Sequence, residues 1–293
     1  MSWLAGFRPI NLRTGAIEAA GRHLSGNALA DLAASHRADP HRMVRQRVLE
    51  IYVQRFPHQA LTPLSDALLD ASASIRQYAR YYLEQMGEGG FLKRYRELAE
   101  GGETRILQAG LRGLGDIGEP RDAQLILPHL ASPSSKTRRL ALRALGHVAP
   151  AVHREHFLAA LEDEIPSNSR MAADIVSEDL DDSSLGRLLN VYIHTRHHHT
   201  RAVVLQIFDN LEFWSRLEYL LRAATASHDH HPHPELNERI AGYLTHWASR
   251  VNYVYTTPSA SQRESVEASL GAVSADFPSG LVGVIREILE RKG

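Results

Sequence analysis

Histidine is the residue type in this 293-residue chain that is best suited to hold a metal ion. The chain holds 17 histidines, and two clusters stand out, one near residue 198 and one near residue 231. Clustered imidazoles are common ligands of transition metals. The candidate metal ligands are His197, His198, His199, His228, His230, His231 and His233. The alternative is a pair of solvated polar loops without an ion, because His-rich tracts also bind added metal adventitiously.

Arginine is the second residue type whose distribution suggests a site. Residues 40–150 hold 16 Lys and Arg against 11 Asp and Glu, a net +5, whereas residues 151–240 hold 8 against 15, a net −7. Guanidinium groups bind carboxylate and phosphate through paired hydrogen bonds. The candidate partner-binding residues are Arg76, Arg80, Tyr81, Arg112, Arg138, Arg139 and Arg143.

Other chemistry has little support in the residues. No cysteine is present, so there is no disulfide framework, thiolate nucleophile or Cys-based zinc site. Phosphate-binding and dinucleotide-binding glycine loops, a G-x-S-x-G elbow and an H-E-x-x-H pair are all absent. We therefore expect no catalytic residues and no cofactor. The first 25 residues lack a signal-like apolar run, and no stretch approaches the roughly 20 apolar residues that span a bilayer. This indicates a cytoplasmic protein without a membrane partner.

A 13-residue phrase that returns every 31 residues determines how these side chains are positioned. The phrases read VRQRVLEIYVQRF (44–56), IRQYARYYLEQMG (75–87), ILQAGLRGLGDIG (106–118) and TRRLALRALGHVA (137–149). Apolar or small residues occupy phrase positions 1, 5, 8, 9 and 12. In the third phrase these are Ile106, Gly110, Gly113, Leu114 and Ile117. Spacings of three and four place them on one helical face, with positions 2, 3, 6 and 7 facing outward.

A second predicted helix precedes each phrase, so each unit is a helical hairpin. These helices are expected at 61–71, 91–100, 122–131 and 154–165, and degenerate phrases occur at 13–25, 168–180, 200–212 and 236–248. A fixed period of this size is typical of a solenoid. We expect an all-α, right-handed α-solenoid of about eight hairpins over 1–251. Its clearest repeats lie at 40–150 and its capping repeats at both ends. A loop and closing helices should follow over 252–293.

The phrase resembles the HEAT repeat, in particular the short bacterial HEAT-like units of the phycobilisome-lyase type. Their consensus runs roughly V-R-x-x-A-x-x-A-L-G-x-I-G. The matching residues are Arg76, Ala79, Leu83 and Gly87; Leu114, Gly115, Ile117 and Gly118; and Arg138, Ala141, Ala144, Leu145 and Gly146. The match is clear over 40–150 and weaker to about 250. Such a resemblance implies a fold more than a function, since the family includes scaffolds, regulatory subunits, chromophore lyases and hydroxylases.

The resemblance implies that the second helix of each hairpin lines a concave face. The candidate arginines would then form a ridge along that face, between acidic positions at Glu50 and Asp174. We therefore expect a non-catalytic scaffold or regulatory subunit that presents an Arg-lined groove to an acidic or phosphorylated protein. The His clusters precede the phrase helices at Thr200 and Leu236. We expect them on hairpin loops of adjacent units, along one edge.

Two alternatives stay open. One is a protein that binds the nucleic-acid backbone and is related to the HEAT-like alkylation-repair glycosylases. The net charge of −1 and the absence of Trp from the central units weaken this interpretation. The other is a subunit of a lyase-type HEAT enzyme, for which the sequence carries no separate signature. The HEAT-like iron hydroxylases carry repeated His-Glu dipeptides, and none occurs here.

Overall fold

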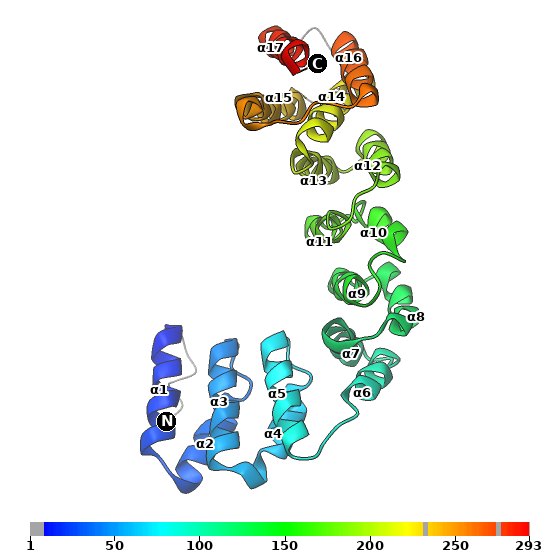
Figure 1. The fold of residues 1–293 in the computed structure, drawn as a ribbon. Helices are drawn as coiled ribbons and strands as arrows, with labels where there is room; N and C mark the ends of the chain where they lie inside the picture. The colour runs from blue at the N-terminus through cyan, green and yellow to red at the C-terminus, as the bar shows by residue number, and fades with distance from the viewer. Residues whose placement is uncertain (1–8, 231–233, 274–276, 293) are drawn as a thin grey trace. The chain divides into compact units, whose positions relative to one another are not determined.

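The chain is helical throughout the residues that the structure, a computed structural model, describes: 9–230, 234–273 and 277–292. These residues form 17 α-helices and four short 3-10 helices, with no strand (Figure 1). The α-helices are α1 (Ile10–His23), α2 (Gly26–His36), α3 (Arg42–Arg55), α4 (Leu61–Ala67), α5 (Ala73–Gln85), α6 (Phe91–Ala99), α7 (Thr104–Ile117), α8 (Ala123–Ile126), α9 (Ser135–Val148), α10 (Arg154–Ala160), α11 (Pro166–Val176), α12 (Asp182–His194), α13 (His198–Asp209), α14 (Phe213–His230), α15 (Pro234–Ser249), α16 (Ala260–Ala272) and α17 (Ser279–Lys292). The 3-10 helices are η2 (Pro57–Gln59), η3 (Pro120–Asp122), η4 (Leu127–Ala131) and η5 (Val251–Tyr253).

The eight phrase helices are all present, as α1, α3, α5, α7, α9, α11, α13 and α15. The predicted partner helices appear as α4, α6 and α10. The stretch at 122–131 is broken into α8 and the 3-10 turns beside it, and Pro128 stands at the start of η4. Proline lacks the amide hydrogen that an α-helix interior requires. The prediction of an all-α chain is therefore confirmed for the described residues.

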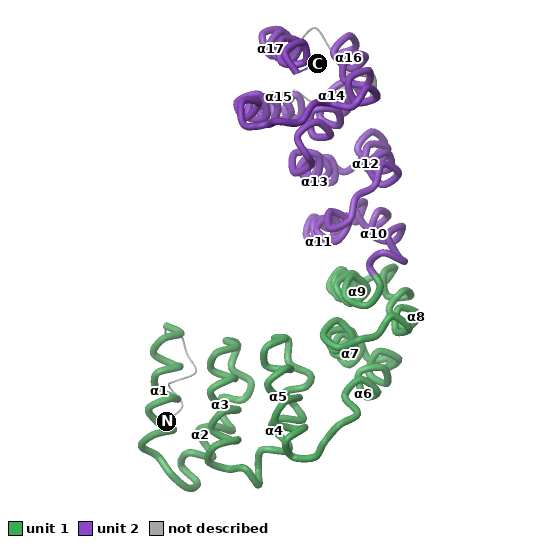
Figure 2. Tube along the Cα trace, in the orientation of Figure 1, with its two compact units in different colours: residues 1–149 green, residues 150–293 purple. Residues whose placement is uncertain are grey.

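The chain divides into two compact units, residues 1–149 and 150–293 (Figure 2). Within the first unit α3 packs against α1 and α5, α6 against α7, and α7 against α9. Within the second, α11 packs against α10 and α13, and α14 against α13 and α15. The closing helices α16 and α17 pack on α14 and α15, so residues 252–293 belong to the second unit instead of standing apart.

The core of the first unit follows the phrase. Val44, Ile75, Ala79, Leu114 and Leu145 are all buried. One predicted core residue, Ile106, is 38% exposed instead. It lies in the first turn of α7, where its side chain borders an open pocket and not a neighbouring helix. The phrase pattern predicted this position wrongly because the α7 face is not covered along its whole length.

Two glycines allow α6 and α7 to touch. A methyl group on Gly113 would overlap the ring of Tyr95, and one on Gly110 would overlap the backbone of Ala99. Tyr95 is fully buried, and its hydroxyl donates to the Leu68 carbonyl oxygen at 3.1 Å. Small residues at phrase positions 5 and 8 therefore hold the α6–α7 hairpin closed around a buried aromatic ring.

We predict that Gly113→Ala lowers the free energy of unfolding by about 1–3 kcal/mol, because the added methyl displaces the Tyr95 ring from a packed contact. Gly115→Ala is the matched control in the same helix, since its methyl would meet Ala144 at an ordinary 3.4 Å. That control should stabilise the helix by up to about 1 kcal/mol. Chemical denaturation of the two variants checks the prediction, and equal stabilities would refute the packing role of Gly113.

Candidate anion-binding surface

Arg76 is buried, although its phrase position predicted an outward side chain. It is 3% exposed and forms two 2.7 Å contacts with the Asp116 carboxylate, through Nε and Nη2. Arg80 adds a 3.2 Å contact to the same carboxylate and donates to the Tyr95 hydroxyl at 3.3 Å. Both arginines of α5 therefore hold one aspartate of α7. This clasp joins two successive hairpins and leaves Arg76 closed to a binding partner.

Arg76 also belongs to a recurring turn contact. In each case an arginine donates to the backbone carbonyl six residues before it, and the residue there accepts an N–H from two residues further on through its side chain. The pairs are Arg45 with Asp39, Arg76 with Asp70, Arg138 with Ser132 and Arg201 with Thr195. These side-chain turns and arginines fix the connection inside each hairpin. Arg138 therefore has a structural role in addition to the predicted binding role.

A second recurring contact joins one hairpin to the next. Arg13 lies 3.3 Å from the Asp39 carboxylate, and Arg45 contacts Asp70 through Nε and Nη2 at 2.7 Å each. Arginine and aspartate are 26 and 25 residues apart in these pairs. For Arg76 the equivalent residue is Gly101, which has no carboxylate, and Arg76 binds Asp116 instead.

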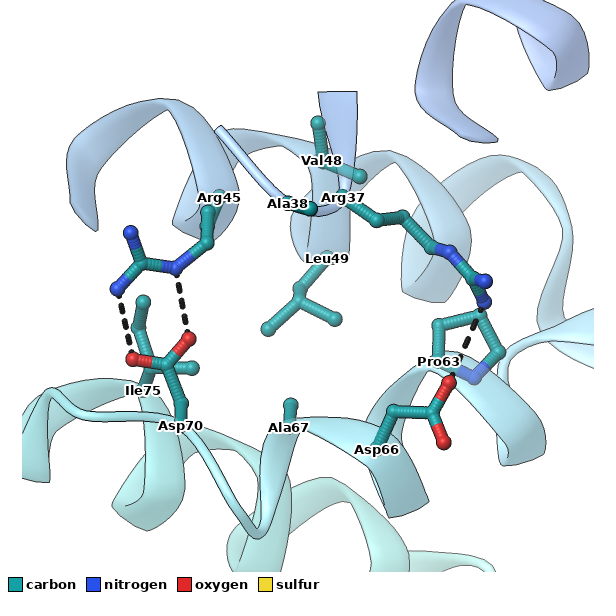
Figure 3. Close-up of a pocket in the computed structure, with 10 residues that line it drawn as sticks. All are labelled: Arg37, Ala38, Arg45, Val48, Leu49, Pro63, Asp66, Ala67, Asp70 and Ile75. Carbon is teal, nitrogen blue, oxygen red and sulfur yellow. Dashed lines mark hydrogen bonds and ion pairs between the residues drawn. The ribbon is translucent and has the colours of Figure 1, made fainter. Parts of the chain in front are cut away.

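A pocket of about 220 Å³ lies beside the Arg45–Asp70 pair (Figure 3). At its other end Arg37 contacts Asp66 at 3.5 Å, and Leu49 lies between the two ion pairs. The charged groups that line this pocket are paired with one another. No unpaired group is left to orient a ligand, so we do not assign a binding role to this pocket.

Three of the candidate arginines are different, because within the described residues they form no hydrogen bond or ion pair. Arg112 on α7 is half-buried, while Arg139 and Arg143 on α9 are exposed. Two further cations share this property and were not singled out from the sequence: Arg105 and Lys136, both exposed. The five residues Arg105, Arg112, Lys136, Arg139 and Arg143 are called the cationic surface below.

The repeat places these cations at matching positions. Arg105 and Lys136 are 31 residues apart, as are Arg112 and Arg143, and α7 packs directly against α9. The phrase begins one residue after Arg105 and Lys136, so an analysis confined to the phrase omits them. Extending the comparison by one residue would have found both.

A pocket of about 460 Å³ lies between the turn before α5, α7 and the start of α9. Three members of the cationic surface line it: Arg105, Arg112 and Lys136. The other lining residues are Leu69, Ala71, Glu103, Ile106, Gln108 and Ala109. Gln108 is buried, and its Nε2 donates to the Thr137 hydroxyl at 3.0 Å, which joins α7 to α9 at the pocket. This space is called the cationic pocket below.

Arg112 carries its charge at an energetic cost. Burial lowers the pKa of its guanidinium, and repulsion from Arg76 lowers it further, against a weaker attraction from Asp70. The guanidinium stays protonated at neutral pH because an ordinary arginine pKa exceeds 12. The two carboxylates nearby are already bound, Asp70 by Arg45 and Asp116 by Arg76. The fold therefore holds a partly desolvated cation without a counter-ion.

The remaining predicted positions behave in different ways. Tyr81 is 56% exposed and packs edge-on against Tyr82, with ring centroids 5.0 Å apart. Glu50 is engaged by Arg47 and by the Gln46 amide at 3.3 Å, so this acidic position is not a free shoulder. Asp174 lies in the second unit and is exposed.

The histidine clusters are placed differently from the prediction. Only His197 precedes its helix; His198 and His199 begin α13, and His199 Nε2 lies 2.9 Å from the Asp163 carbonyl oxygen. α14 continues to His230, so the backbone of His228 and His230 is helical and not a loop. The side chains of these two, and His231 and His233 entirely, lie outside the described residues. Within the described part no group of three potential ligands is present, and the metal site stays a prediction.

No protein-family model and no curated protein matches this chain. The assignment of function therefore rests on its residues and their geometry. Among the described residues, none of the helices combines the length and the apolar character needed to cross a membrane.

We predict opposite stability effects for two arginines of neighbouring helices. Arg76→Met should lower the free energy of unfolding by about 3 kcal/mol, because it breaks a buried, bidentate ion pair. Arg112→Met should leave stability unchanged or raise it, because it removes a desolvated cation that has no counter-ion. Thermal and urea unfolding of both variants checks this. A large loss of stability in Arg112→Met would show that Arg112 is a structural residue.

Proposed function

We propose that this chain is a non-catalytic, cytoplasmic interaction scaffold or regulatory subunit, built as a right-handed α-solenoid of about eight HEAT-like hairpins. The eight phrase helices at a 31-residue period support the repeat architecture. So do the contacts between successive helices within each unit. A preformed helical surface loses little entropy on binding, which suits a scaffold.

The cationic surface is the observation that carries the functional proposal. Five cations lie on two packed helices, and within the described residues none has an acidic partner. Like charges gathered in this way repel one another and contribute nothing to folding stability. Their arginine groups present forked donors that bind carboxylate or phosphate. We propose that an acidic or phosphorylated segment of a partner protein binds here.

A nucleic-acid strand is the second candidate. The exposed ring of Tyr81 on α5 favours it, because aromatic side chains near cations stack on unpaired bases. The cationic surface, however, is confined to α7 and α9, while α3 carries Glu50 at the matching position. A long backbone would need a longer cationic path. The protein partner is therefore the better supported of the two.

We expect the double variant Arg139→Glu/Arg143→Glu to lose capture of the partner from a lysate of the native host, identified by mass spectrometry. The charges of both exposed side chains are reversed without a buried contact being broken. The matched control is Arg42→Glu/Arg94→Glu, which reverses two exposed, unpaired arginines on α3 and α6. It should capture the partner as the unaltered chain does.

Two further arms decide the class of partner. Binding should weaken between about 50 mM and about 300 mM salt, since exposed charge contacts are screened. Nuclease treatment of the lysate should leave a protein partner bound. Capture that is indifferent to both charge reversals and to salt would refute the proposed function, and capture lost after nuclease treatment would favour nucleic acid.

A further inference from the structure

We infer that the cationic pocket is a binding site for a phosphate monoester, the side chain of a phosphoserine or phosphothreonine in a partner protein. That the phosphate belongs to a protein rests on the proposed function. The affinity for a phosphate monoester rests on the pocket itself. The argument uses its charge, its lack of an internal counter-ion, its apolar rim and its restriction to one place in the repeat.

The charge of the pocket matches a dianion. Arg105, Arg112 and Lys136 supply three positive charges and Glu103 one negative charge, which leaves a net +2. A phosphate monoester carries about −1.5 to −2 at pH 7. A carboxylate or a phosphodiester carries only −1 and would leave the pocket with an excess positive charge. The monoester is therefore the anion that neutralises this set of residues.

The protein leaves this charge for a ligand to neutralise. The half-buried Arg112 is flanked by Arg76, and the carboxylates of Asp70 and Asp116 are each held by two 2.7 Å contacts to another arginine. Neither acid can turn to Arg112 without breaking a bidentate ion pair. A bound anion would remove the cost of the desolvated guanidinium, and this gain occurs only in the complex.

The rim of the pocket adds an apolar element. Leu69 and Ile106 are 36% and 38% exposed, and both line the pocket. Free phosphate would leave these side chains in water. A phosphorylated residue followed or preceded by an apolar side chain would cover them. The pocket therefore fits a phosphorylated residue with an apolar neighbour in the peptide.

The same helix positions carry other residues in neighbouring repeats. Arg105 and Arg112 correspond to Ser74 and Tyr81 in α5, and to Met43 and Glu50 in α3. The HEAT-like pattern therefore does not require cations here. Packing is maintained by the apolar positions in every unit, so the charge at α7 and α9 serves a purpose other than the fold.

The test uses the full chain and the peptide acetyl-Leu-phosphoserine-Leu-amide, followed by the change in its ³¹P chemical shift. The phosphopeptide should bind in a saturable way, with affinity rising from about pH 5 to about pH 7, because its second pKa is near 6. The unphosphorylated peptide should not displace it, and the glutamate analogue should compete at least about tenfold more weakly. A charge-assisted hydrogen bond of about 1.5–3 kcal/mol corresponds to roughly this factor or more.

The variants locate the binding site. Arg112→Gln should weaken phosphopeptide binding about tenfold or more while the protein stays folded, and Ile106→Ser should weaken it by a smaller factor. Arg94→Gln on α6 makes the same charge change at an exposed, unpaired arginine outside the pocket and should bind normally. Equal affinity in Arg112→Gln and the unaltered chain would overturn the inference. So would equal binding of the phosphorylated and unphosphorylated peptides.

The two proposals can fail separately. Phosphatase treatment of the host lysate should abolish partner capture if the pocket holds a phosphorylated residue. Capture that survives phosphatase but is lost in Arg139→Glu/Arg143→Glu would keep the scaffold and overturn the phosphate site. A single-stranded oligonucleotide that binds more tightly than the phosphopeptide, in a manner dependent on Arg112, would overturn the assignment of a protein ligand.

Discussion

The ion pair between Arg76 and Asp116 is the contact on which the surface of the first unit depends. It joins the hairpin of α4 and α5 to that of α6 and α7, and it is reinforced by Arg80. The same contact removes Asp116 from the α7 surface, one helical turn beyond Arg112. The bond that connects two hairpins therefore also keeps a neighbouring cation without a counter-ion. In this part of the fold, stability and binding capacity have a common origin.

The helices were predictable because a 31-residue period repeats the same apolar spacing in each unit. The phrase located all eight of its helices, and the closing helices were expected near their observed places as α16 and α17. The break at 122–131 was missed, although Pro128 was visible in the sequence. The exposure of Ile106 could not be read from its own phrase, since it depends on whether a neighbouring helix covers the first turn of α7.

The candidate site was only partly predictable, because position in a phrase does not distinguish a buried arginine from an exposed one. Arg76 and Arg143 both looked outward by periodicity, yet one is enclosed by a carboxylate and the other is in solvent. Long-range spacing held the missing signal, since Arg13–Asp39 and Arg45–Asp70 are separated by 26 and 25 residues. The His clusters show the same limit. The length of α14, which decides whether His228 lies in a loop, is set by packing outside the cluster.

Gly101 has an effect well beyond its own turn. In the preceding hairpins the equivalent turn residue is an aspartate that receives the arginine of the previous unit, whereas Gly101 has no side chain to offer. Arg76 consequently recruits an acid from the binding helix, and that helix is left with a surplus of positive charge. A repeat array can thus acquire a specialised surface through the loss of one side chain, at a residue that a ligand never touches. Divergence among copies of a repeat then creates function by subtraction, while the shared apolar positions keep every copy folded.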